Sequence, residues 1–420
     1  MKLVFLINKM NDYGTYSGII NEAIRNKFKV VCLHNEDPLV SKNFFIKPSI
    51  NKSPYKNQVK IEKIFFKKNL YQKLSKIDCD YIFTKKLSIE SLNKKFVKKL
   101  KNKICILMDS LDIADVLKDI HYLNDYKVNI FIWTLYHKKR ILKILKENYR
   151  PSYLSLKKNY HKFFVVGHNY FDFKINKEFM KKKYRVPKGK KVILYCPFSY
   201  DDNNVHVNQK YWKVFFSGLN IDFYPEAKII KKKILNFILK TFFLIRSFIF
   251  SYSKIFKFFK IKSEYQILKE IKNFCDKNNH YLIIKTRKKY PINSACFKFS
   301  HQVVEDDQTR QNPGKLQEII SFVDFNICYG SHVAFEVALK NVPTIVIQTP
   351  KVDWPSFFYK HWGPKNKFYN YKDVIRSVAP EKFKLNFRRV TNRKFNEYKN
   401  IYLGNDNISK NILKILKRNQ

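Results

Sequence analysis

The chain has 420 residues, well above the length of one ordinary domain, so we expect two domains of similar size. Hydrophobic residues make up 45% of it and aromatic residues 16%, which supports two buried cores and excludes a disordered or fibrous protein. The formal charge of +49 predicts a strongly positive surface that attracts anionic lipids and nucleotide phosphates.

Lysine supplies most of this charge, and arginine contributes little. Arginine is the side chain that binds guanine and phosphate in bidentate geometry, so an excess made of lysine is better explained by an AT-rich genome than by nucleic-acid recognition. We therefore predict no specific nucleic-acid partner. The seven cysteines never approach C-x-x-C spacing and no secretion signal precedes the first apolar run, which predicts reduced core thiols in a cytoplasmic protein.

Short β-rich runs alternate with helical stretches in the first third of the chain, a pattern that predicts a parallel sheet with crossover helices. Strands are predicted at Lys2–Ile7, Lys29–Leu33, Tyr81–Phe83, Ile104–Met108, Val128–Trp133 and Phe163–Val166. The residues between Asn8 and Ser17 are rich in turn formers, so we expect a loop there. Its Tyr13-Gly14-Thr15 segment is expected to close on an acceptor or a phosphate.

A second unit opens with a turn of Pro, Gly and Lys residues after Tyr184. Its strands are predicted at Val192–Tyr195, Tyr281–Lys285, Phe325–Cys328 and Thr344–Ile347, and its helices at Glu264–Asn278, Lys315–Val323 and His332–Lys340. The pattern favours an α/β protein of two doubly wound halves. We predict domains at residues 1–172 and 173–395, followed by a helix at 396–420 that returns to the first domain.

Residues 227–262 break this rhythm with ten Lys or Arg, no acidic residue and many Ile, Leu and Phe. Cations such as Lys240, Arg246 and Lys254 interrupt every apolar stretch before the roughly 20 residues that a membrane span needs. On a helix the apolar residues share one sector. This predicts either a helix lying in an anionic membrane interface or an amphipathic helix packed on the protein's own core.

The stretch from Asp324 to Ile347 predicts a buried strand, a turn at Gly330 and Ser331, a helix and a second strand. Gly330 lets the backbone approach a ligand, while Ser331 caps the helix and leaves free N–H groups for a phosphate. Glu336 lies about one turn inside the helix, where its carboxylate accepts hydrogen bonds from ribose hydroxyls. The alternative is an ordinary strand-turn-helix unit with a surface glutamate.

Ser331 and Glu336 ahead of Pro343 resemble the nucleotide-binding element of GT-B glycosyltransferases, the fold shared with UDP-sugar 2-epimerases. The run from Phe164 to Asn169 and the run from Val192 to Pro197 resemble the interdomain crossing and the first strand of the second domain in transferases of bacterial surface polysaccharides. Among these, the branch similar to CDP-glycerol glycerophosphotransferases is the most alike. The chain lacks that branch's Lys-x-His-Pro strand end and its Trp-His-Gly-Thr-like element.

The resemblance implies a GT-B fold of two Rossmann-like domains that face a central cleft, with the donor held by the second domain. It implies that Lys285 and Arg287, after a strand, hold the donor diphosphate together with Gly330, Ser331 and His332, while Glu336 holds the ribose. Arg287 also has Glu305, Asp306 and Asp307 as possible partners, and His332 also suits a capping role. No metal and no cofactor are expected, because basic side chains and a helix end neutralise the diphosphate.

An inverting transferase needs a base on its acceptor side, and the candidates are Asp109 and His137; each also suits the cap of the following helix. His168 lies at the domain crossing, where it could reach the cleft, and a hinge-packing role is favoured. The function implied is transfer of a sugar, or of a polyol phosphate, from a nucleotide-activated donor to a surface polysaccharide or a lipid-linked acceptor, on the inner face of the cell membrane. The alternatives are a UDP-sugar 2-epimerase-like enzyme and a non-catalytic scaffold that binds membrane or glycan.

Overall fold

The chain divides into two compact units, each built on one parallel sheet. This computed structural model describes residues 1–36, 49–84, 100, 103–108, 128–148, 150–157, 161–168, 173–197, 264–286, 294–305, 313–329, 332–338, 340–347, 375–378, 382–385 and 407–419. Unit 1 contains Met1–Lys183, Asp306–Phe322 and Thr391–Gln420, and unit 2 contains Tyr184–Glu305 and Val323–Val390. The segment 227–262, for which a membrane-interface or core-packed helix is predicted, lies outside the described residues.

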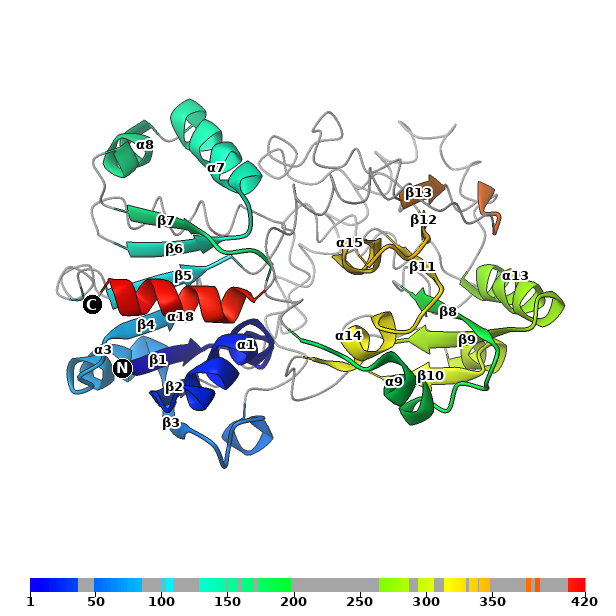
Figure 1. The fold of residues 1–420 in the computed structure, drawn as a ribbon, viewed down its shortest axis with the longest axis horizontal. Coiled ribbons are helices and arrows are strands. Elements are labelled where there is room, and N and C mark those ends of the chain that lie inside the picture. Colours follow the sequence, from blue (N-terminus) through cyan, green and yellow to red (C-terminus); the bar gives the residue numbers. More distant parts are fainter. Residues whose placement is uncertain are drawn as a thin grey trace, which may run out of the picture. The chain divides into compact units, whose positions relative to one another are not determined.

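Unit 1 holds a sheet of seven strands in the order β3-β2-β1-β4-β5-β6-β7, shown at the left of Figure 1. All its strand pairs are parallel. The strands are β1 (Lys2–Ile7), β2 (Lys29–Asn35), β3 (Lys60–Ile64), β4 (Tyr81–Thr84), β5 (Ile104–Leu107), β6 (Val128–Ile132) and β7 (His161–Val165). Every predicted strand of this sheet is confirmed to within two residues of its bounds, and β3 was not predicted.

Both faces of the first sheet are covered by helices, which is why its inner strands β1, β4 and β5 are mostly apolar. Side chains alternate along β1, so Val4 and Leu6 join one core while Leu3, Phe5 and Ile7 join the other. The first core contains residues of α3 (Phe66–Ser75) and α7 (Leu135–Asn148). The second contains residues of α1 (Asn11–Arg25) and α18 (Ile408–Arg418).

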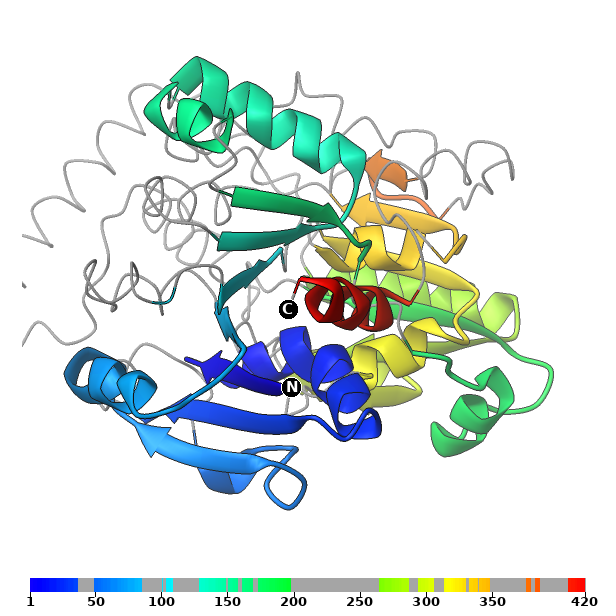
Figure 2. The same cartoon turned by 60° about the vertical axis from the view of Figure 1, so that its left-hand side comes forward.

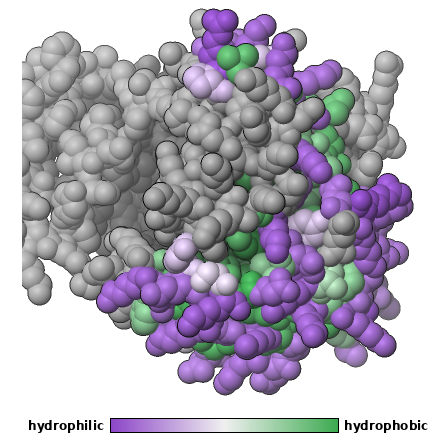
Figure 3. Space-filling model, turned by 90° about the vertical axis from the view of Figure 1, so that its left-hand side faces the viewer, coloured by the Kyte–Doolittle hydropathy of each residue, from purple (hydrophilic) through white to green (hydrophobic). Residues whose placement is uncertain are grey.

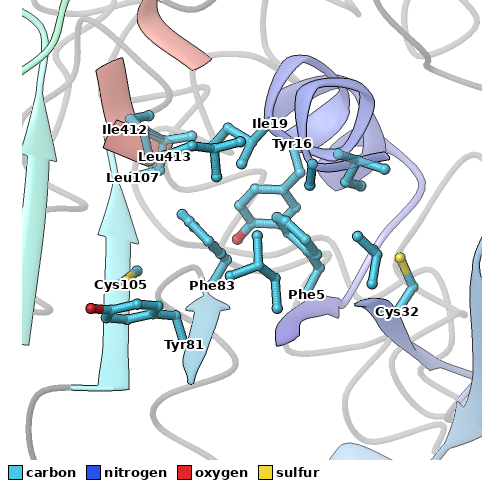
Figure 4. Close-up of a cluster of buried hydrophobic side chains, with 14 of the residues drawn as sticks. Phe5, Tyr16, Ile19, Cys32, Tyr81, Phe83, Cys105, Leu107, Ile412 and Leu413 are labelled. Carbon is cyan, nitrogen blue, oxygen red and sulfur yellow. The ribbon is translucent and has the colours of Figure 1, made fainter. Parts of the chain in front are cut away.

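Helix α18 comes from the far end of the chain and packs beside α1, as Figures 1 and 2 both show. Its Ile412 and Leu413 lie with Tyr16 and Ile19 of α1 over the phenylalanines of the sheet (Figure 4). Phe5 and Phe83 stack there with their ring centroids 4.8 Å apart. The Tyr81 hydroxyl donates to the Leu416 carbonyl over 2.9 Å, which fixes the end of α18 to the sheet.

The loop expected between Asn8 and Ser17 is wrong, because α1 already begins at Asn11. Asp12 makes the short turn possible, since its Oδ2 atom accepts the backbone N–H groups of Asn8 and Lys9 over 2.8 and 3.0 Å. Tyr13 and Tyr16 are buried against the sheet. Their packing outweighs the low helix propensity of the glycine and serine residues among them.

Unit 2 holds a sheet of six parallel strands in the order β10-β9-β8-β11-β12-β13. The strands are β8 (Lys191–Cys196), β9 (His280–Lys285), β10 (Gln302–Val304), β11 (Phe325–Tyr329), β12 (Thr344–Ile347) and β13 (Ile375–Val378). In chain order this is the doubly wound arrangement 3-2-1-4-5-6 of a Rossmann unit. The predicted α/β class with two doubly wound halves is therefore confirmed.

Helices cover this sheet as well. Helix α13 (Glu264–Lys277) buries Ile267, Leu268 and Ile271 in a core with β8, β9, β11 and β12. Helix α15 (His332–Ala338) packs on β11 and β12. The remaining described helices of the chain are η1 (Ile50–Lys52), α8 (Arg150–Lys157), α9 (Lys177–Lys183), η4 (Ser294–Phe299) and α14 (Lys315–Ile320).

The packing of α18 in the core of unit 1 can be tested by mutation. Replacing Ile412, which is fully buried, by alanine removes apolar contacts and leaves a cavity. We expect a loss of about 2–5 kcal/mol in the free energy of unfolding, measured by denaturant titration. Lys414→Ala, on the exposed side of the same helix, is the control and is expected to change it by less than about 0.5 kcal/mol. Equal stabilities for the two variants contradict the packing.

Candidate functional site

The carboxyl edge of the second sheet has the geometry of a ligand site. In a doubly wound sheet, ligands bind beyond the carboxyl ends of the strands at the point where the strand order reverses. Here that point lies between β8 and β11, whose residues Cys196 and Cys328 are register partners. Two buried charged side chains come from elements near this point: Lys285 from β9, which pairs with β8, and Glu336 from α15, which follows β11.

Lys285 is the last residue of β9, the strand next to β8. Its side chain is only 6% exposed, and its Nζ donates to the carbonyl of Thr286 over 2.9 Å. The backbone N–H of Thr286 donates in turn to Val304 of β10, so the strand end is held in place. A buried ammonium group is costly to desolvate, and an anion bound at this edge would offset that cost.

Glu336 lies on α15, the helix that begins three residues after β11 ends. It is 8% exposed and its neighbour Val337 is fully buried, so the alternative of a surface glutamate is wrong. The helix is short, and Glu336 stands just over one turn from its start. A carboxylate at this depth can accept hydrogen bonds from paired hydroxyl groups such as those of a ribose.

Several residues that were predicted for this site are not among the described residues. Arg287, Gly330 and Ser331 lie outside the described residues, and so does the acceptor-side candidate Asp109. His332 is the first residue of α15, but its side chain is not described. Lys285 and Glu336 are thus the two predicted donor-binding side chains whose surroundings are known.

His137, the other predicted base, is a fully buried residue in the first turn of α7. Its Nδ1 lies 2.8 Å from the Thr134 hydroxyl, and its backbone N–H points to the same oxygen over 3.4 Å. Burial, with the nearby Arg140 charge, lowers the pKa of His137 to about 3. The geometry is that of a helix cap, and such a low pKa is poorly matched to proton abstraction near neutral pH.

His168 follows β7 and lies against Trp133, with the ring centroids 3.8 Å apart. Trp133 itself donates from its indole nitrogen to the Met108 carbonyl over 2.8 Å. Both rings are buried. The contact is a packing contact, in keeping with the role expected for His168.

A second polar cluster, which the sequence did not single out, lies at the carboxyl ends of β1 and β2 in unit 1. Asn35 donates to Asn8 over 2.6 Å, and Nδ1 of His34 lies 2.8 Å from the Tyr13 hydroxyl. Asp12 accepts the N–H groups of the β1–α1 turn. The protein's own carboxylate therefore occupies the amides that bind phosphate in many Rossmann units, which argues against a phosphate at this turn. The expected closure of Tyr13-Gly14-Thr15 on a ligand is also wrong, because these residues lie inside α1.

The His34 imidazole is held neutral by its surroundings. Burial lowers its pKa to about 4, against the opposing effect of the Glu36 and Asp12 carboxylates. Burial also raises the pKa of the Tyr13 hydroxyl above its ordinary value. The pair is thus a neutral hydrogen bond inside the core.

Within the ranges given above, no cluster of three or more His, Cys, Asp or Glu residues suits a metal ion. Over the same ranges, no helix is long and apolar enough to cross a membrane.

Comparison with known proteins identifies the fold. No family model matches the chain, and no curated protein matches it by sequence. Among solved structures, a histidine-to-alanine variant of the wall teichoic acid polymerase TagF matches 100% of this chain and 88% of its own, at 13% identity and a TM-score of 0.52. A TagF variant soaked with CDPG matches at 11% identity, with the same coverage of the two chains and a TM-score of 0.50. UDP-GlcNAc 2-epimerase from Methanocaldococcus jannaschii covers 100% of both chains at 13% identity, with a TM-score of 0.49.

The chain therefore has the GT-B-like fold of two Rossmann-like units, as the resemblance predicted. The TagF structures share this fold, and TagF is a wall teichoic acid polymerase. At these identities the likeness concerns the fold alone.

The buried histidines predict how stability depends on pH. The unfolded chain protonates His34 near its ordinary pKa of 6.5, while the folded chain does so only near 4. Stability is therefore expected to fall as the pH drops from about 6.5 to about 4, by about 1.4 kcal/mol per pH unit for each such histidine. Denaturant titrations across this range measure the slope.

The control is His34→Asn, which keeps a hydrogen-bonding group near Tyr13 but does not titrate. It is expected to lower the slope by the contribution of one proton, while His137 still contributes its own. An unchanged slope contradicts the neutral buried state of His34.

Proposed function

We propose that the protein is a GT-B transferase that moves a sugar, or a polyol phosphate, from a nucleotide-activated donor to a surface polysaccharide or a lipid-linked acceptor. The observation that carries the proposal is the pair of buried charges, Lys285 and Glu336, beside the strand-order reversal of the second sheet. They come from a strand and a helix about fifty residues apart in the chain. A ligand that carries an anionic group and paired hydroxyls would offset part of the cost of burying these two charges.

The two side chains suit different parts of a nucleotide. The Lys285 ammonium, on β9, attracts a diphosphate, and Arg287, Gly330, Ser331 and His332 are proposed to complete that subsite. The Glu336 carboxylate would accept the two ribose hydroxyls. The metal-independent mechanism is part of the proposal, with these cations taking up the charge of the leaving diphosphate.

The acceptor side belongs in the proposal to unit 1. Its β1–α1 turn is filled by Asp12, which favours unit 2 as the place of the diphosphate. Asp109 stays the proposed base, because its fellow candidate His137 is buried in the first turn of α7 and is held there by the capping residue Thr134. TagF, which shares the fold, is a polymerase of wall teichoic acid, and this supports a surface polymer as the acceptor class.

Ligand-dependent thermal stabilisation tests the donor class. We expect UDP or CDP, alone or as a sugar or glycerol derivative, to raise the melting temperature of the full chain, because a ligand that binds only the folded state stabilises it by mass action. Glu336→Gln is expected to lower the affinity for that nucleotide about 10- to 100-fold in calorimetric titration, because a hydrogen bond to a charged group is lost.

The matched control is Asp276→Asn, on the exposed side of α13 in the same unit, which should bind as the wild type does. Equal binding by Glu336→Gln and wild type removes Glu336 from the site. If no pyrimidine nucleotide stabilises the chain at millimolar concentration, the transferase proposal fails. If the protein turns over a free nucleotide sugar without an acceptor, the proposed activity is epimerisation and not transfer.

A further inference from the structure

Several large apolar side chains of unit 1 face solvent. Over the described ranges these exposed side chains are Tyr71, Leu135, Leu154, Val165 and Phe179. Three of the five fall between residues 135 and 165, on α7, α8 and β7. The leucine Leu135 is 57% exposed, and Leu154 is 46% exposed. Single exposed leucines are ordinary, but leucines exposed on two helices that pack together, as α7 and α8 do, can contribute to a partner surface.

The same two helices present a dense positive charge. On α7, Leu135, Lys139 and Lys143 are spaced by four residues, so they lie on one face, opposite the buried Ile141 and Leu145. The exposed cations of the two helices are Lys139, Lys143, Lys146, Arg150 and Lys157. We call these five cations, with Leu135 and Leu154, the α7/α8 surface.

Among the residues that the structure describes, one ion pair partly neutralises this charge. Glu147 is the one acidic residue in the sequences of α7 and α8, and its ion pair with Lys143 is long, at 3.9 Å. On β3 of the same unit, by contrast, Lys60 and Lys63 pair with Glu62 and Glu36 at 2.8 Å each. Figure 3 shows hydrophilic side chains around hydrophobic ones at its top, at the height where Figures 1 and 2 show α7 and α8.

We propose that the α7/α8 surface binds an anionic lipid bilayer. A bilayer interface takes up single leucine side chains from a helix while its headgroups attract the surrounding cations, and this needs no fixed partner geometry. Lysine predominates in the surface, which suits a diffuse anionic layer better than bidentate recognition of a particular phosphate. This proposal does not depend on the nucleotide site, since it rests on unit 1 alone.

Sedimentation of the full chain with vesicles tests it. We expect wild type to bind vesicles of phosphatidylcholine with 30% phosphatidylglycerol and not vesicles of phosphatidylcholine alone. Lys139→Gln/Lys146→Gln is expected to lower the partition coefficient about 25-fold, since each cation near an anionic surface contributes about fivefold. The matched control is Lys410→Gln/Lys414→Gln, which removes two exposed lysines from α18 of the same unit and is expected to change it less than threefold.

Equal losses in the two double variants would mean a general effect of net charge and overturn the proposal. So would unchanged binding of Lys139→Gln/Lys146→Gln, which would leave the membrane contact to another part of the chain. Melting temperatures within about 2 °C of wild type confirm that each variant is folded, since exposed substitutions change stability little.

A variant of the two leucines distinguishes binding to a bilayer from binding to a soluble polyanion. Leu135→Ser/Leu154→Ser keeps every charge, and we expect it to lower vesicle binding at least fivefold while binding of heparin stays unchanged. If the variant binds vesicles as well as wild type does, the leucines do not enter the bilayer and the proposal fails. Nucleotide stabilisation of these variants should equal that of wild type, so failure here is distinct from failure of the donor site.

Discussion

The burial of both faces of each parallel sheet is the constraint on which the structure depends. A strand such as β1 contacts helices on either side, so its residues from Leu3 to Ile7 must all be apolar. Polar and charged side chains are therefore found mainly at the strand ends. This is why Lys285 stands at the end of β9, and why the Asn8–Asp12 cluster gathers where β1 ends. The fold itself concentrates the chemistry at one edge of each sheet.

The same constraint explains which elements the sequence predicted. Strands β1 and β12 were predicted with their observed bounds, because buried apolar runs bounded by polar residues have no other stable place in an α/β unit. Strand β3 was missed since it is an edge strand whose Lys and Glu residues make ion pairs on its exposed side. Strand β10 has only three residues, which is too short to show a period.

The charged residues of this chain are of two kinds, exposed and buried. Much of the +49 is spread over exposed helix faces and follows from its lysine-rich composition. A few charges are placed by the fold. Lys285 and Glu336 are buried at a sheet edge, and Asp12 is buried against the amides of a turn. Composition explains the first kind. The second kind needs specific partners, such as the turn amides for Asp12 and the Thr286 carbonyl for Lys285, because a buried charge is costly to leave uncompensated.

The order of strands and helices, the two-unit organisation and the place of Glu336 one turn into a helix all follow from the linear pattern of apolar and turn-forming residues. Whether a polar residue serves as a cap or as part of a site was decided only in three dimensions. His137 and Glu336 are both single polar residues on helices, yet the Thr134 hydroxyl caps the helix at His137, while Glu336 is buried on the helix that follows β11. Hydrophobic periodicity is a local property that the sequence carries, whereas the surroundings of a side chain are made by segments far apart in the chain, as α18 on α1 shows.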